Sequence, residues 1–187
     1  MAALHERLVF DTAHGAGLDE TRRYVLLRAD VLMGLFDALP ARAREEALRA
    51  FGRSVASRGS DSVRAYAARV DADALPALME SAAASLGWGA WTFDRVARRD
   101  GDGDAEPVLR LSVDNSPFAA ATARSGTPAC HAIAGMLEGL AAALWQRPAT
   151  AREIECRAQR GEGRCRFVAL PADRSRSDFN PTQETVS

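Results

Sequence analysis

The 187 residues are the length of one domain, because a single hydrophobic core usually stops growing at about 250 residues. Hydrophobic residues make up 47% of the chain and charged residues 26%, a composition that is ordinary for a globular protein and excludes wholesale disorder. The formal net charge of −1, and the lack of any run near the roughly 18 apolar residues of a membrane helix, predict no nucleic-acid partner and no membrane partner.

The N-terminal part of the chain predicts a β-hairpin followed by a helix. Short apolar runs at residues 4–13 and 21–28 flank the breaker HGAGLDE and predict the two strands of the hairpin. Asp30 is predicted to cap an apolar helix over residues 31–39, which ends before Pro40.

The middle of the chain predicts helices. Apolar residues recur at helical spacing from residue 41 to 70, and we expect Gly59 and Ser60 to divide this stretch into two helices. A third helix is predicted over residues 73–87, with Asp73 as its cap.

The second half of the chain predicts two further hairpins with a helix between them. Alternating residues predict strands over 88–97 and 108–114, and again over 150–159 and 164–170 around the turn RGEG. Between the hairpins lie a loop or short helix and then a strongly apolar helix that begins at Pro128 and ends before Pro148. Together these elements predict an α+β fold, a mainly antiparallel sheet built from hairpins with helices packed on it.

All three cysteines, an odd number, lie in the last third of the chain, at Cys130, Cys156 and Cys165. They are too few for a disulfide framework, and in a reducing compartment such residues are thiols or metal ligands. The first residues lack a charged-then-apolar signal pattern, so we expect a cytoplasmic location.

The placement of these cysteines is typical of a structural zinc site. Cys156 and Cys165 are predicted on the two arms of the last hairpin, and antiparallel pairing brings such residues close together. Cys130 is predicted at a helix start, where the helix dipole lowers the pKa of a thiol. Buried thiols that only pack as small apolar side chains are the alternative.

A fourth ligand is needed, and the neighbouring candidates are Glu153, Glu155 and His131. Side chains of a regular strand alternate between its two faces, so neither glutamate would share a face with Cys156. Either glutamate therefore requires a bulge or an irregular strand.

Aromatic residues gather around the second hairpin and the helix that follows it. They line an apolar ligand pocket or belong to the core: Trp88, Trp91, Phe93, Phe118 and Trp145.

Three pieces of the run from Ser116 to Leu170 carry a family resemblance. They are NSPF, the glycine-containing helix in PACHAIAGMLEG with its opening cysteine, and EIECRAQRGEGRCRF. This run resembles the C-terminal half of the vinyl-4-reductase (4VR) domain family, whose members bind small molecules and serve as sensors in aromatic-responsive transcriptional activators. In the phenol-sensing members a cysteine at the helix start, a glutamate and two hairpin cysteines bind zinc.

The resemblance implies zinc ligands at Cys130, Glu153, Cys156 and Cys165, although the interval between the two hairpin cysteines is one residue longer than is usual in the family. It also implies one 4VR-like ligand-binding domain over residues 1–172, followed by a polar C-terminal tail over residues 173–187.

The function expected from the resemblance is that of a cytoplasmic, zinc-containing domain that binds a small hydrophobic or aromatic molecule in a sensory or regulatory role. A homodimer is expected as its partner state. Two alternatives remain: an accessory protein or reductase acting on a vinyl group in tetrapyrrole metabolism, and a non-catalytic assembly scaffold. No nicotinamide or flavin fingerprint supports an enzyme.

Overall fold

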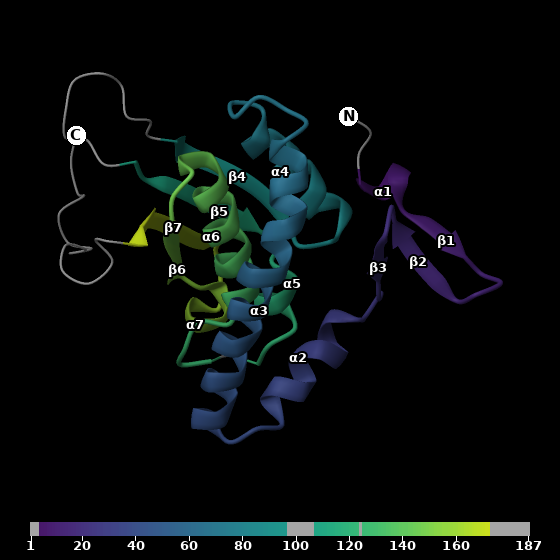
Figure 1. Ribbon diagram of the computed structural model, residues 1–187. Coiled ribbons are helices and arrows are strands. Elements are labelled where there is room, and N and C mark those ends of the chain that lie inside the picture. Colours follow the sequence, from purple (N-terminus) through teal and green to yellow (C-terminus); the bar gives the residue numbers. More distant parts are fainter. Residues whose placement is uncertain (1–3, 97–106, 124, 173–187) are drawn as a thin grey trace.

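The computed structural model describes residues 4–96, 107–123 and 125–172 (Figure 1). The polar tail predicted at 173–187 and most of the turn predicted between the strands of the second hairpin lie outside the described residues.

The chain begins with a small antiparallel sheet. After the short helix α1 (Leu4–Arg7), the strands β1 (Val9–Asp11), β2 (Ala16–Asp19) and β3 (Arg22–Tyr24) pair in the order β1-β2-β3. The prediction of a two-stranded hairpin was wrong, because the residues read as a breaker form the central strand. Gly15 and Glu20, both at positive φ, stand on either side of β2. The buried carboxylate of Asp19, paired with Arg7, makes this strand look polar in the sequence.

Three helices follow: α2 (Ala29–Asp37), α3 (Ala41–Ala67) and α4 (Leu75–Ser85). Both predicted caps were wrong. Asp30 lies inside the first turn of α2 and accepts a hydrogen bond from the Val31 N–H, while Arg28 takes the cap position. Ala74, and not Asp73, precedes α4, whose first turn is stabilised by Pro76.

The predicted break in α3 does not occur, because its small residues serve close packing against the helix α6 (His131–Trp145). A Cβ atom added to Gly135 of α6 would lie 2.1 Å from the carbonyl oxygen of Gly52 on α3. One added to Gly139 would lie 2.7 Å from the Ser60 hydroxyl, which hydrogen-bonds back to the Ala56 carbonyl of its own helix. These residues therefore bring two helices together and do not end one.

The main sheet has four antiparallel strands in the order β4-β5-β7-β6. The second predicted hairpin is formed by β4 (Ala90–Val96) and β5 (Leu109–Asp114), and the third by β6 (Ala149–Glu155) and β7 (Cys165–Pro171). Two short helices complete the chain, α5 (Pro117–Ala120) after β5 and α7 (Arg157–Arg160) within the last hairpin. The predicted α+β class, with hairpins in a mainly antiparallel sheet covered by helices, is confirmed.

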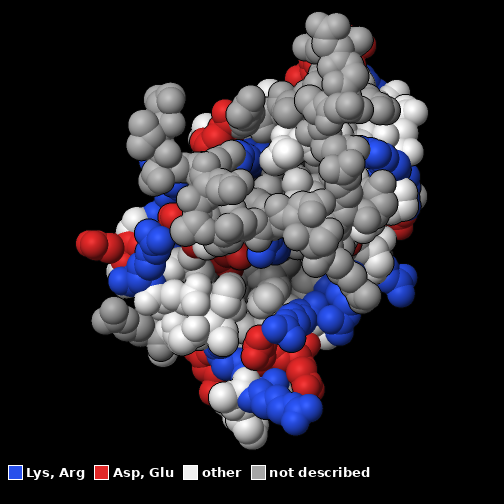
Figure 2. Space-filling model, turned by 90° about the vertical axis from the view of Figure 1, so that its left-hand side faces the viewer, with Lys and Arg blue, Asp and Glu red and all other residues white. Residues whose placement is uncertain are grey.

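The helices α6 and α3 lie side by side over one face of this sheet, and the N-terminal sheet stands at one flank (Figure 1). The centre of the core lies between α6 and the strands β5 and β7, and its fully buried members are Leu109, Leu111, Val113, Ile133, Leu137, Leu140 and Phe167. Basic and acidic side chains are intermixed on the face shown in Figure 2. Among the described residues, no helix combines the length and apolar character needed to cross a bilayer.

The contact between α3 and α6 makes a test of the packing. We predict that Gly135→Ala lowers the free energy of unfolding by at least about 2 kcal/mol, because its methyl group overlaps backbone of α3. The matched control is Gly34→Ala on α2, where an added Cβ meets nothing within 4 Å and the better helix propensity stabilises by up to about 1 kcal/mol. Urea denaturation measures both, and equal effects of the two substitutions would contradict the packing.

Candidate metal centre and apolar cavity

Four side chains that the sequence singled out meet at one point. One ligand atom from each of Cys130, Glu153, Cys156 and Cys165 can be chosen so that all lie within 4.8 Å of one another. Cys130 is the N-cap residue of α6, Glu153 lies near the end of β6, Cys156 precedes α7, and Cys165 opens β7. The three cysteines are free and buried. The cluster therefore joins the long core helix to both strands of the last hairpin.

An irregularity in β6 makes this meeting possible. The register against β7 shifts between Glu153 and Glu155, where Glu153 pairs with Phe167 and Glu155 with Arg166. A bulge of this kind inserts one residue and reverses the alternation of faces beyond it. Glu153 and Cys156, which would face opposite sides of a regular strand, thus reach the same side.

Hydrogen bonds tie the donors to one another and to nearby backbone. The Sγ atoms of Cys130 and Cys165 lie 3.7 Å apart, and the Cys130 N–H donates to Oε2 of Glu153 at 3.0 Å. The Arg157 N–H lies 3.4 Å from Sγ of Cys165. The other oxygen of Glu153, Oε1, is buried and has no hydrogen-bond partner among the described residues.

The crowding of acidic groups shifts their pKa values in opposite directions. Hydrogen bonds with Cys156 and Cys165, together with burial, raise the pKa of Cys130 far above its ordinary value. Hydrogen bonds with the same neighbours, Cys130 first, lower the pKa of Cys156. Burial and then the charge of Cys156 raise the pKa of Glu153. The helix dipole was expected to lower the pKa of Cys130, but like-charge neighbours and burial outweigh it.

This donor set fits a metal ion. Four buried acidic groups cannot all ionise at this separation unless a cation neutralises them, and thiolates with a carboxylate are metal ligands. The unpartnered Oε1 of Glu153 supplies a donor atom that no hydrogen bond uses. Three cysteines and one glutamate thus lie close enough to bind a metal.

The other two candidates for a fourth ligand lie elsewhere. Glu155 accepts a hydrogen bond from Arg160 at 3.3 Å and lies 3.8 Å from Arg166. His131 lines a separate cleft of about 200 Å³ between α3 and α6, together with Glu138.

A cavity of about 270 Å³ lies between α3, α4 and the start of β4. Its apolar wall includes Val63 of α3, Met79 of α4, Met136 of α6 and the two tryptophans Trp88 and Trp91. The indole N–H of Trp91 donates to the Trp88 carbonyl at 3.2 Å, so this polar atom is already satisfied. The cavity therefore offers mainly apolar surface.

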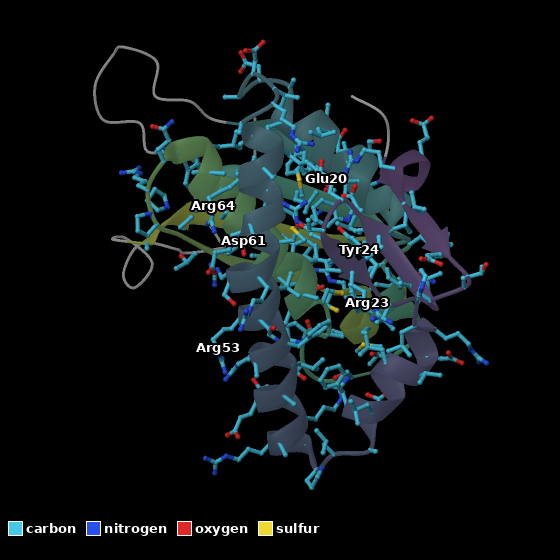
Figure 3. All side chains as sticks on the ribbon, turned by 45° about the vertical axis from the view of Figure 1, so that its right-hand side comes forward. Glu20, Arg23, Tyr24, Arg53, Asp61 and Arg64 are labelled. Carbon is cyan, nitrogen blue, oxygen red and sulfur yellow. The ribbon has the colours of Figure 1, made fainter. Side chains whose placement is uncertain are left out.

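Two tyrosines add polar groups to this wall. Tyr66 accepts a hydrogen bond from Arg7 at 3.0 Å, and Arg7 is fixed by two hydrogen bonds to the buried Asp19. Tyr24, at the end of β3, also lines the cavity, and burial raises the pKa of its hydroxyl, which therefore stays protonated (Figure 3). Both hydroxyls are available as hydrogen-bond donors.

The predicted aromatic set divides between the cavity and its surroundings. Trp88 and Trp91 line the cavity, and Phe118 packs edge-on against Trp88 with ring centroids 5.3 Å apart. The ring of Phe93 lies 6.5 Å from that of Trp91, and Trp145 ends α6. Sequence reasoning missed the lining residues of α3 and α4, whose helical spacing identified them only as core.

Comparison with known proteins identifies the segment that carries the metal cluster. Residues 109–171 match the family model of the vinyl-4-reductase (4VR) domain. The chain contains a 4VR domain. The predicted resemblance is thus confirmed over a segment that includes Cys130, Glu153, Cys156 and Cys165, while most of the cavity wall lies outside it.

Two solved structures are similar. One is the crystal structure of the phenol-responsive sensory domain of the transcription activator PoxR with phenol, with a TM-score of 0.74 at 18% identity, covering 91% of this chain and 88% of that chain. The other is a vinyl-4-reductase family protein from Methanocaldococcus jannaschii, with a TM-score of 0.45 at 15% identity, covering 78% of this chain and 91% of that chain. No curated protein sequence matches this chain significantly.

The structure adds one residue of the 4VR segment to the cluster. Ser116 is buried, and its Oγ atom lies 3.2 Å from Sγ of Cys130. The same oxygen accepts the Ala119 N–H and so caps α5. Its place in the NSPF motif was the available signal, but the sequence did not indicate that this serine contacts a cysteine 14 residues later.

We predict that Ser116→Ala lowers the free energy of unfolding by about 1–2 kcal/mol, because it removes a helix cap and a hydrogen bond to a buried thiol. The control is Ser81→Ala, at an exposed position of α4, which changes stability by less than about 0.5 kcal/mol. Thermal and urea denaturation measure both variants. A Ser116 variant as stable as the control would show that this contact contributes nothing.

Proposed function

We propose that this chain is a cytoplasmic, zinc-containing domain that binds a small hydrophobic or aromatic molecule and has a sensory or regulatory role without catalysis. Residues 1–172 form its ligand-binding domain, and residues 173–187 are a tail. The single observation that carries this proposal is the apolar cavity between α3, α4 and β4, with two tryptophans and two tyrosines in its wall.

The size and lining of the cavity fit a molecule with one aromatic ring. Its volume of about 270 Å³ is near the lower end of the range of small-molecule sites. Apolar side chains supply most of the contact area, and the hydroxyls of Tyr24 and Tyr66 supply directional hydrogen bonds to a polar substituent. The fold shared with the phenol-responsive domain of PoxR supports a ligand of this class.

Zinc is the metal that best matches the donors at the cluster. Zn²⁺ prefers four ligands in a tetrahedron and binds thiolates with one further nitrogen or oxygen donor. Cys130, Cys156, Cys165 and Glu153 would fill all four positions, so the metal would stabilise the fold and have no open position for water. Free thiols in this number also fit the reducing environment of the cytoplasm.

A sensor that lacks an output activity must pass its signal to a partner, and we propose a second copy of the chain as that partner. The alternative of a pure assembly scaffold accounts less well for the cavity, since a scaffold has no use for an apolar pocket lined by aromatic residues.

The zinc proposal is tested by exchanging each neighbouring glutamate for glutamine. We predict that Glu153→Gln lowers the zinc affinity by about tenfold or more, because it removes a charged ligand. Glu155→Gln, two residues away and paired with Arg160, keeps the affinity of the unchanged protein. Competition with a chromophoric chelator measures both affinities, and the melting temperature of the unchanged protein falls when zinc is removed.

An equal loss of affinity in both variants would contradict the assignment of Glu153 as the ligand. A protein purified without zinc, whose melting temperature does not respond to zinc or chelator, would contradict the metal itself.

Ligand binding is tested by filling the cavity. We predict saturable quenching of tryptophan fluorescence by phenol, and an affinity at least about tenfold lower in Ala82→Phe, whose ring occupies the space of the ligand. The control Ala84→Phe adds the same ring at an exposed position of the same helix and leaves binding unchanged.

If phenol and other monocyclic aromatic compounds fail to bind the unchanged protein, the proposed ligand class is wrong. NADPH-dependent reduction of a vinyl group on an added tetrapyrrole would instead establish the reductase alternative.

A further inference from the structure

The N-terminal part of the chain exposes far more apolar surface than the rest of the described residues. Eight large apolar side chains between residues 9 and 39 are at least 37% exposed. This N-terminal apolar surface consists of Val9, Phe10, Val25, Leu26, Leu27, Val31, Leu35 and Leu39. Elsewhere in the described part of the chain, Ile154 is the one large apolar residue in the same class, at 38%.

The surface runs along one side of the molecule. The N-terminal sheet and α2 lie on the same flank in Figure 1, joined by the segment that contains Val25, Leu26 and Leu27. Figure 3 turns this flank forward, with Arg23 and Tyr24 on β3 and with Arg53 on the opposite side of α3. The exposed residues thus belong to neighbouring elements on one face.

The helix α2 is apolar on two opposite sides. Met33 and Phe36 are buried against the core, while Val31, Leu35 and Leu39 follow one another at intervals of four residues and stay exposed. A helix that is apolar all round normally has both sides covered. The outer side of α2 therefore requires a partner.

The exposed area matches the requirement of a stable dimer. The eight side chains together present on the order of 800 Å² of apolar surface, which is the area that each partner buries in a standard-size interface. The largest apolar patch on a typical monomer is smaller, about 300–600 Å².

The charges around the surface are already neutralised within the chain. Asp30 pairs with Arg28, Asp37 with Arg44 at 2.9 Å, and Asp11 with His14 at 2.7 Å. A surface with paired charges at its edge has no preference for a strongly acidic or basic partner. It is suited to a copy of itself, because an isologous interface places the same patch on both sides.

We propose that the N-terminal apolar surface is the interface between two copies of this chain. The inference rests on the homodimer of the proposed function and names the surface that forms it. The strand β1 is an edge of its sheet, pairing with β2 alone, so its outer backbone groups also face the second copy.

The surface is also connected to the cavity. Tyr24 lines the cavity, and Val25, the next residue, is 81% exposed on the proposed interface. A ligand that contacts Tyr24 therefore lies one residue from the second copy, which gives the proposed sensor a short path to its partner.

The test is the oligomeric state of the full chain, measured by sedimentation equilibrium from about 1 to about 100 µM, a range suited to an interface of this area. We expect the unchanged protein to be a dimer. Leu26→Arg and Leu35→Arg, at separate parts of the surface, each weaken the dimer by at least about tenfold. The control Ser57→Arg adds the same charge at an exposed position of α3 and leaves the dimer intact.

Circular dichroism and phenol binding verify that each variant is folded. A monomeric unchanged protein at every concentration would overturn both the surface and the homodimer. An unchanged dimer that both surface variants retain would overturn this surface alone. Neither result depends on whether phenol binds the cavity.

Discussion

The structure depends on one junction, where three buried thiols and a carboxyl group hold the start of α6 against the end of β6 and the start of β7. Four acidic groups at this separation repel one another as anions, so the junction needs either retained protons or a cation. The unpartnered oxygen of Glu153 is consistent with a cation. A metal there would link elements far apart in sequence and fix the core helix on the sheet.

The cavity depends on the helices positioned by that junction. Because α6 is fixed on the sheet, its glycines can hold α3 at close range, and α3 in turn supplies Val63 and Tyr66 to the cavity wall. The buried pair of Arg7 and Asp19 then attaches the N-terminal sheet to Tyr66. Metal cluster, cavity and N-terminal surface thus form one connected sequence of contacts.

The sequence predicted the α+β class and grouped the cluster residues because cysteine spacing and strand alternation are local signals. It also indicated that Glu153 would need a bulge, and β6 has one at that point. It failed where tertiary contacts override local preference. Gly59 and Ser60 look like a helix break but serve helix packing, and Asp19 looks like a turn residue but is a buried ion-pair partner. The cavity could not be predicted, since helical spacing does not distinguish core from pocket.

X-ray absorption spectroscopy at the zinc edge of the purified protein tests the central claim most directly, because it reads the atoms around the metal. The account predicts one zinc per chain with three sulfur neighbours at about 2.3 Å and one oxygen neighbour at about 2.0 Å. A protein without zinc, or a zinc surrounded only by oxygen and nitrogen, would contradict it.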